Sequence, residues 1–207
     1  LCNSAIVFER RVGGQETTLG VSGKLRNSDM IMYDRLTENW WQQFTGEAIV
    51  GPRTGEKLKI VPSRLESFAR FAKRAPNGKV LVPNNPNARR YVANPYVNYD
   101  SSARPFLYRG SMPEGIAPME RVVRVKGTAW SMPLLQRLGR IAEGDLILTW
   151  EPGQASAVDS SRISEGREVG KVIVQRQTSS GPVDVAYEVT FAFVFHAFEP
   201  EGRLITG

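Results

Sequence analysis

The chain is poor in the two side chains that most often carry redox and metal chemistry, with one cysteine and one histidine in 207 residues. A single cysteine, Cys2, excludes a disulfide within this chain and leaves a thiol that is free or has its partner elsewhere. A single histidine, His196, excludes a histidine-rich metal cluster and a two-histidine acid–base pair. The first residue is Leu1 rather than methionine, so we expect a processed or truncated product.

Long hydrophobic runs and blocks of one charge are also missing. The longest apolar run, residues 192–198, is interrupted by His196 and is far too short to cross a membrane. The net charge is +6 at pH 7, but the basic residues occur as scattered pairs such as Arg10 with Arg11 rather than as a stripe with interleaved aromatics. We therefore expect no membrane span in this chain and no specific nucleic-acid partner.

The pattern of the first 82 residues predicts a β unit. Short apolar runs flank the glycine pair at residues 13–14, and two further runs, 30–34 and 40–44, are joined by a polar turn. At Ser63 the period changes to that of an amphipathic helix, which we place at residues 64–74. Residues 79–82 read as a further strand.

The rest of the chain divides into a connection and a second β unit. Residues 83–120 are rich in proline, asparagine and tyrosine and have no sustained period, which is typical of a functional loop or an interdomain wrap. The second unit spans residues 121–207 and contains a brief helix between Ser131 and Gly139. Its clearest feature is strict alternation over residues 183–195, which predicts one long, half-buried strand with Glu188 and His196 on the polar side.

These patterns favour a mainly β fold, or a β-rich α+β fold, with one or two short helices. A weak internal repeat suggests that the two units are a duplicated β-hairpin or barrel-like unit: Ser4-Ala5-Ile6 recurs as Ser156-Ala157-Val158. The alternative is coincidence among common small residues. On the duplicated reading, the first unit lacks an opening that would precede Leu1.

Three segments carry a resemblance to a known family: LCNSAIVF (residues 1–8), SGKLRNSDMIMYDRLTENWWQQFTGEAIVGP (22–52) and PGQASAVD (152–159). They resemble secreted bacterial and archaeal proteins that are catalogued only as a domain of unknown function. The motifs are an L-C-N-S-A sequence, which in members follows C-P, and a Y-D-R-x-T-x-x-x-W-x-Q-x-x-G sequence. The resemblance implies a periplasmic or extracellular location, supplies no activity, and makes Cys2 the second cysteine of a C-x-x-C pair.

The resemblance also transfers family positions onto this chain, namely Cys2, Ser4, Asp34, Trp41, Gln43 and Gly46. Two positions depart from the family pattern: Glu9 stands where aspartate is common, and His196 stands where an aromatic residue is typical. The second departure puts a family role for His196 in doubt.

The first functional hypothesis is centred on Cys2. A C-x-x-C pair in an oxidising compartment is a disulfide, a redox couple or a site for a soft metal such as copper(I) or zinc. We therefore name Cys2, with His196, as candidate metal ligands, and we predict a metal- or redox-handling domain. A Cys2–His196 nucleophile–base dyad is a further alternative.

The second hypothesis is a module that binds a small ligand, a glycan or a peptide. Trp40, Trp41, Gln42 and Gln43 offer flat aromatic faces beside amides, and Asp34 lies close by in sequence. The alternative is ordinary strand packing of one tryptophan with its neighbour at the rim. The carboxylates of this stretch follow no spacing rule for acid–base catalysis, and Ser4 and Ser156 are not in a nucleophile-elbow pattern. A hydrolytic enzyme is therefore a third alternative, with no reaction assigned.

Overall fold

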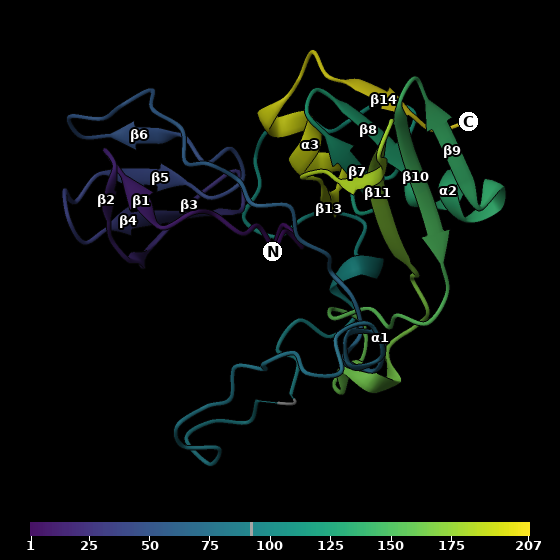
Figure 1. The fold of residues 1–207 in the computed structure, drawn as a ribbon, viewed down its shortest axis with the longest axis horizontal. Coiled ribbons are helices and arrows are strands. Elements are labelled where there is room, and N and C mark those ends of the chain that lie inside the picture. Colours follow the sequence, from purple (N-terminus) through teal and green to yellow (C-terminus); the bar gives the residue numbers. More distant parts are fainter. Residues whose placement is uncertain (92) are drawn as a thin grey trace.

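The structure is a computed structural model that describes residues 1–91 and 93–207. Within these residues the chain forms fourteen strands in four sheets, together with three α-helices. The prediction of a mainly β fold is therefore confirmed. Figure 1 shows the strands of residues 11–50 gathered on one side, those of residues 121–205 on the other, and the N terminus between the two groups.

A four-stranded antiparallel sheet forms the first group. Its strands lie side by side in chain order, and they are β3 (Leu19–Arg26), β4 (Asp29–Asp34), β5 (Trp40–Gln42) and β6 (Ala48–Val50). One face of this sheet packs on a small core that includes Met32, Trp41 and Ala48. The register pairs Met32 with Trp41 and Trp41 with Ala48, and directly paired residues of neighbouring strands point to the same face.

A short hairpin of β1 (Arg11–Val12) and β2 (Gln15–Glu16) packs beside this sheet. It turns through Gly13 and Gly14, whose φ angles of 57° and 80° lie in the left-handed region that glycine adopts without strain. The predicted turn at these glycines is confirmed.

Two further four-stranded sheets form the second group. One has the order β13-β7-β8-β14, and its strands are β7 (Arg121–Val125), β8 (Thr128–Ser131), β13 (Glu188–Phe191) and β14 (Arg203–Ile205), with β14 parallel to β8. The other is an antiparallel meander of β9 (Arg140–Glu143), β10 (Leu146–Glu151), β11 (Lys171–Thr178) and β12 (Gly181–Asp184). This meander and the sheet of the first group share the same up-and-down order, and the duplication stays a prediction.

Helix α2 (Met132–Leu138) lies where the sequence predicts it, and its two ends show why. The Ser131 hydroxyl accepts a hydrogen bond from the backbone N–H of Leu134 at 3.2 Å, which caps the first turn. Gly139 ends the helix with a φ of 68°. Local capping therefore explains why this helix was readable from the sequence.

The predicted single strand over residues 183–195 is wrong. The chain breaks between β12 and β13, and at Ala192 it turns into helix α3 (Ala192–Phe198). The alternating phenylalanines misled the prediction because every residue from Phe191 to Phe195 is buried, so hydrophobic periodicity cannot distinguish a strand from a buried helix there. Phe191, Phe193 and Val194 instead pack in a core with Cys2 and Phe44.

The segment between the two groups also differs from its prediction. Helix α1 is shorter than expected, Phe68–Arg74, and the predicted strand at residues 79–82 is absent from this described stretch, where Leu81 is 98% exposed. Helix α1 buries none of its own residues, so an apolar face does not hold it in place. The described part of residues 83–120 contains one short 3-10 helix (Tyr99–Ser101), whose backbone bonds to the loop at residues 158–161.

Candidate functional site

Strands β7 and β13 carry charged residues into the interior on both of their faces. The antiparallel register sets Glu188 directly opposite Arg124 and Phe191 opposite Arg121. Because side chains alternate along a strand, Arg121 and Arg124 project from opposite faces of β7. Each face of this strand pair therefore has its own arginine, and Arg121 is buried whereas Arg124 is partly buried.

Glu188 is the least compensated charge on this strand pair. The residue is 4% exposed, and neither carboxylate oxygen has a hydrogen-bond partner in the described part of the chain. Arg124 Nη1 lies 3.3 Å from Oε1, which is an ion-pair distance. Burial raises the pKa of Glu188 to about 8 despite the opposing effect of Arg124, and the nearby Asp29 and Glu199 carboxylates raise it further. At pH 7 the Glu188 side chain is therefore mostly a neutral acid that can donate a hydrogen bond.

Arg124 is shared between two acids and an aromatic ring. Its Nε donates to Glu199 Oε1 at 2.7 Å, and its guanidinium lies 4.8 Å from the centre of the Phe44 ring. Phe44 in turn stacks on Phe198 with ring centroids 4.9 Å apart. Arg124 thus joins the second group of strands to the first, which contributes Phe44.

Arg124 and Glu188 both line a cavity of about 580 Å³. Its wall is mainly apolar and includes Ile60, Pro62, Val125, Val183, Val185 and Tyr187. Two more basic residues, Lys126 and Arg176, lie along its lining, with Asp184. An apolar cavity of this size with a few polar groups is the usual form of a small-ligand site.

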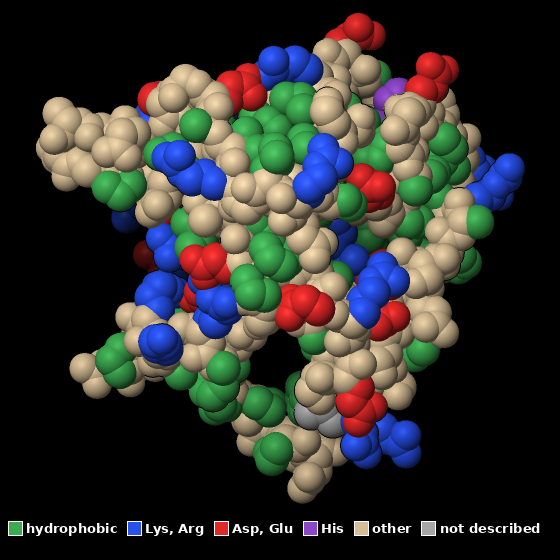
Figure 2. All heavy atoms as spheres, turned by 90° about the vertical axis from the view of Figure 1, so that its right-hand side faces the viewer, with side chains coloured by type: hydrophobic (Ala, Val, Ile, Leu, Met, Phe, Trp, Pro, Cys, Tyr) green, Lys and Arg blue, Asp and Glu red, His purple; other side chains and the backbone are tan. Residues whose placement is uncertain are grey.

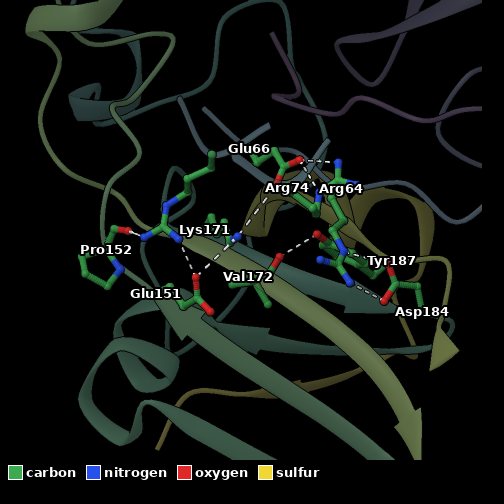
Figure 3. A network of polar contacts seen from close by, with 10 residues as sticks. Arg64, Glu66, Arg74, Glu151, Pro152, Lys171, Val172, Asp184 and Tyr187 are labelled. Carbon is green, nitrogen blue, oxygen red and sulfur yellow. Dashed lines mark hydrogen bonds and ion pairs between the residues drawn. The ribbon is translucent and has the colours of Figure 1, made fainter. Parts of the chain in front are cut away.

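A polar network fixes one wall of this cavity, as Figure 3 shows. Arg64 holds Asp184 through two hydrogen bonds of 2.6 and 2.7 Å, and the Tyr187 hydroxyl donates to the carbonyl of Val172 at 2.6 Å. Burial raises the pKa of Tyr187 to about 12, so this hydroxyl stays a donor. Because Arg64 pairs with the Asp184 carboxylate, Asp184 offers little net charge to a ligand.

The same network fastens helix α1 to β11. The buried Lys171 ammonium lies 3.4 Å from Glu151 and 3.7 Å from Glu66, and Arg74 pairs with Glu66. Arg70 also reaches Glu151, at 2.6 Å. Charge pairing thus takes the place of an apolar face for this helix.

Cys2 lies at the seam between the two groups of strands. Its Sγ is 3.1 Å from Asp29 Oδ1, and its backbone carbonyl accepts a hydrogen bond from the Thr190 hydroxyl at 2.7 Å. Burial raises the pKa of the Cys2 thiol to about 12, and the Asp29 carboxylate adds to the rise. Burial also raises the pKa of Asp29, whose other oxygen accepts from Gln42 and from the backbone of Phe44. The thiol is therefore held in its protonated, unreactive form.

The two predicted metal ligands have different surroundings. Cys2 is buried against Asp29, whereas His196 lies on α3 and its Nε2 is 3.0 Å from the Ser111 hydroxyl. Within the described residues, no group of three or more His, Cys, Asp and Glu side chains is placed to hold a metal ion. The residues present do not form a complete copper or zinc site, and a metal role of Cys2 with His196 stays a prediction.

The predicted binding platform is mostly interior. Trp41 is 1% exposed and donates its indole N–H to Asp34 Oδ2 at 2.9 Å, while Gln42 and Gln43 are also buried. Trp40 alone is partly exposed, with the Lys24 ammonium 5.6 Å from its ring centre. A ligand can therefore reach only Trp40 of these four side chains, and its binding role stays a prediction.

Asp34 stabilises the β4–β5 turn. Besides Trp41, it accepts hydrogen bonds from the backbone and hydroxyl of Thr37 and from the backbone of Leu36. Burial acts to raise the pKa of Asp34, but these hydrogen bonds outweigh it and lower the pKa. Both of its oxygens accept hydrogen bonds within the turn, and its binding role stays a prediction.

The other face of β7 carries a second buried cluster, made of Asp100, Arg121, Ser156 and Arg167. Asp100 Oδ2 accepts from Ser156 Oγ at 2.6 Å and from Arg121 Nη2 at 2.8 Å, and Arg167 Nη2 lies 3.1 Å away. Burial acts to raise the pKa of Asp100, but these partners outweigh it and lower the pKa. Ser156 belongs to the PGQASAVD segment, so this segment anchors the connection to the second group of strands.

Sequence reasoning missed the residues that the structure brings together at the cavity. The alternating pattern of residues 183–195 places Glu188 on the polar side of a strand, which predicts an exposed side chain. No motif or spacing in the sequence marks Arg124 as a candidate site residue. The only signal in the sequence is that both stand within β-branched strand segments. That signal does not show that the two strands pair.

Charge on the surface is dispersed. Figure 2 shows Lys and Arg side chains interspersed with Asp and Glu over one face of the molecule rather than gathered in a stripe. Within the described residues, no helix is long and apolar enough to span a membrane.

A family model described as "Protein of unknown function (DUF3179)" matches residues 1–202 of the chain. Comparison with curated proteins and with solved structures found no match. The family likeness therefore identifies relatives without assigning an activity.

Proposed function

The chain belongs to the DUF3179 family of unknown function, and from that premise we propose that it is a binding module for a small organic anion with an apolar body. The site is the cavity of about 580 Å³ beside β13. The apolar wall holds the body of the ligand, and Arg124 and Glu188 recognise its charged end. The proposal agrees with the predicted binding-module function, but it places the ligand in the Glu188 cavity rather than at Trp40 and Trp41.

The balance of charge along the cavity supports an anion. Arg124, Lys126 and Arg176 line the cavity. Arg124 is paired with Glu199 and Arg176 with Asp145, so within the described residues Lys126 is the basic group without an ion-pair partner. Of the two acids, Asp184 is held by Arg64, and Glu188 is mostly protonated at pH 7 because its pKa is about 8. A neutral carboxylic acid beside a guanidinium presents donors to a carboxylate, which accepts them.

The observation that carries the proposal is the state of Glu188. A buried carboxyl group without a hydrogen-bond partner costs free energy, and strongly perturbed acids in cavities are concentrated at functional sites. A bound anion supplies the acceptor that the protonated Glu188 lacks.

Calorimetric titration at pH 7 tests the chemistry of the ligand with three probes of equal chain length, octanoate, octylamine and 1-octanol. We expect saturable binding of octanoate and binding of octylamine that is at least about tenfold weaker. Preferential binding of the amine, or no binding of octanoate, would overturn the proposal.

Variants test the location. Ala186→Trp fills the cavity and abolishes octanoate binding, whereas Ala142→Trp on exposed β9 leaves it unchanged. Lys126→Gln weakens binding, whereas Lys73→Gln on α1 does not. In the wild type the affinity falls as the pH rises through about 8, because ionised Glu188 repels the carboxylate, and Glu188→Gln removes this pH dependence.

The second candidate function is metal or redox chemistry at Cys2. The contact of 3.1 Å between Sγ and Asp29 Oδ1 supports it, since a thiol and a carboxylate, two groups that can ligate a metal, already lie together. The test is stoichiometric binding of copper or zinc by the protein, measured by metal analysis. Loss of binding in Cys2→Ser supports the role, and absence of binding by the wild type ends it.

The location of the protein is a further proposal. Its likeness to secreted proteins supports a periplasmic or extracellular site of action. Fractionation of cells that express the tagged full-length protein tests this, with recovery among cytoplasmic markers as the contradicting result.

A further inference from the structure

A second cavity, of about 390 Å³, lies at the start of β7 beside Arg121, whereas the Glu188 cavity lies beside residues 124–126. It is lined by the Asp100 segment, by Arg121 and Arg167, and by the start of helix α2. The function proposed above makes no use of these residues. The cavity is nevertheless within the size range of small-ligand sites.

Asp100 has one engaged oxygen and one free oxygen. Oδ2 receives Arg121 and Ser156, while Oδ1 has no hydrogen-bond partner within the described residues. The Asp100 side chain is 0% exposed, so bulk water does not satisfy Oδ1. A buried carboxylate oxygen without a donor is unfavourable, and Asp100 lines the cavity.

Arg121 complements this acceptor with donors. Nη2 makes the bonds to Asp100 and Ser156, and within the described residues the other two guanidinium nitrogens make no hydrogen bond. Arg121 also lines the cavity. One acceptor and further donors therefore lie side by side, which is the arrangement that a hydroxyl group or a pair of hydroxyl groups satisfies.

The charges around the cavity exclude a strongly charged ligand. Arg121 and Arg167 lie beside three acids of the lining, Asp100, Glu120 and Glu168. Glu168 is held by the backbone N–H groups of Gly153, Gln154 and Gly170, and burial raises the pKa of Glu120, which favours its neutral form. A cation meets two guanidinium groups, and an anion meets the Asp100 carboxylate. A neutral ligand meets neither penalty.

The remaining lining suits a polyhydroxylated molecule. Ser101, Ser102 and Gln136 provide polar contacts, whereas Met119 and Met132 provide an apolar surface for ring C–H groups. We infer that this cavity is a second binding site, for a neutral ligand of saccharide size that donates a hydroxyl to Asp100 and accepts from Arg121.

Three probes of matched size test the inference: glucose, glucosamine and glucuronate, followed by ¹H–¹⁵N NMR of the intact chain. We expect glucose to shift resonances of residues around the cavity saturably. We expect glucosamine and glucuronate to bind about tenfold more weakly, because each adds a charge that the site opposes. No saturable shift with glucose means that water alone satisfies Asp100, and it overturns the inference, as does preference for either charged probe.

Variants keep the test specific. Ala117→Trp fills the cavity from an exposed lining position and abolishes the glucose shifts, whereas Ala142→Trp leaves them unchanged. Asp100→Asn tests the acceptor directly but also touches the buried cluster, so it is interpreted only beside the Ala117 variant. Octanoate binding at the Glu188 cavity is unaffected by Ala117→Trp, so failure of one site is distinguishable from failure of the other.

Discussion

Arg121 and Arg124 stand three residues apart on β7, yet their acidic partners are in opposite states. Asp100 concentrates three basic or hydroxyl partners on one oxygen, and its pKa is lowered. Glu188 has only Arg124 at 3.3 Å and two other acids nearby, and its pKa is raised to about 8. Both side chains are almost inaccessible to solvent, but the donors on Asp100 offset the cost of burying its charge, whereas Arg124 does not offset the cost at Glu188.

The comparison separates a structural ion pair from a candidate site. Asp100 and Arg121 join the connection to the second group of strands, and removing Arg121 leaves the Asp100 charge buried with Arg167 as its remaining basic partner. Glu188 is already mostly neutral at pH 7, and neither of its oxygens has a hydrogen-bond partner within the described residues. A bound ligand could therefore still bond to this carboxyl group. Four substitutions test this difference, in order of decreasing effect on the free energy of unfolding.

Arg121→Met should have the largest effect. It leaves ionised Asp100 buried with only the half-exposed Arg167, and we expect it to lower the free energy of unfolding by about 3–5 kcal/mol. Urea denaturation measures it. The control is Arg162→Met in the exposed pair with Glu165, which should change stability by less than about 1 kcal/mol. A small effect of Arg121→Met would show that the pair is not a structural anchor.

Glu188→Gln should have the opposite sign, with a gain of a few kcal/mol at pH 8, on the order of magnitude that the pKa shift implies. The pKa of Glu188 lies above its model value of 4.5, so in the folded state it keeps a proton that the unfolded state has lost. Stability from this group is present below pH 4.5 and is lost as the pH rises to about 8. Glutamine mimics the protonated acid and removes this loss.

Denaturation curves at pH 5 and pH 8 measure the effect. The gain from Glu188→Gln should be small at pH 5 and large at pH 8. The contribution of Asp100 to the free energy of unfolding has the opposite pH dependence. The pKa of Asp100 is lowered, so its contribution is present above pH 3.8 and is lost as the pH falls below that value. Equal effects of Glu188→Gln at both pH values would contradict a raised pKa.

Arg124→Met should cost less than Arg121→Met, about 1–2 kcal/mol at pH 7. Methionine retains apolar contact with the Phe44 ring, Glu188 is mostly neutral, and Glu199 is partly exposed. Chemical denaturation of the two arginine variants side by side makes the comparison. If Arg124→Met is the more destabilising of the two, Glu188 is ionised in the folded protein.

The sequence predicted the parts of the fold that local chemistry determines. The Ser131 cap with Gly139 predicted helix α2, and the two glycines at residues 13–14 predicted the first hairpin. It failed at residues 192–198, where complete burial removes the periodicity that distinguishes a helix from a strand. The division of the chain at residues 82 and 120 stays a prediction.

The residues of the candidate site could not be predicted from the sequence, because they are distant from one another along the chain. Cys2, Asp29 and Thr190 meet at the seam, and Arg124 meets Glu188 only through strand pairing. The tryptophan pair was conspicuous in the sequence, yet Trp41 packs in the core of the first sheet, where Asp34 accepts a hydrogen bond from its indole N–H. Composition marks aromatic and polar residues, but only tertiary pairing shows which of them are enclosed.

Cys2→Ala should have the smallest effect of the four. It removes the S–H donor to Asp29 and one buried sulfur, and we expect a loss of about 1 kcal/mol that is nearly the same at pH 6 and pH 8. The pH independence follows because the thiol, with a pKa of about 12, is protonated throughout this range. Urea denaturation at the two pH values measures it, with Thr190→Val, which removes the bond to the Cys2 carbonyl but keeps the thiol, as the matched variant. A loss that changes strongly between pH 6 and pH 8 would mean that the thiol ionises in the folded protein, and it would favour redox or metal chemistry at Cys2 over ligand binding beside Glu188.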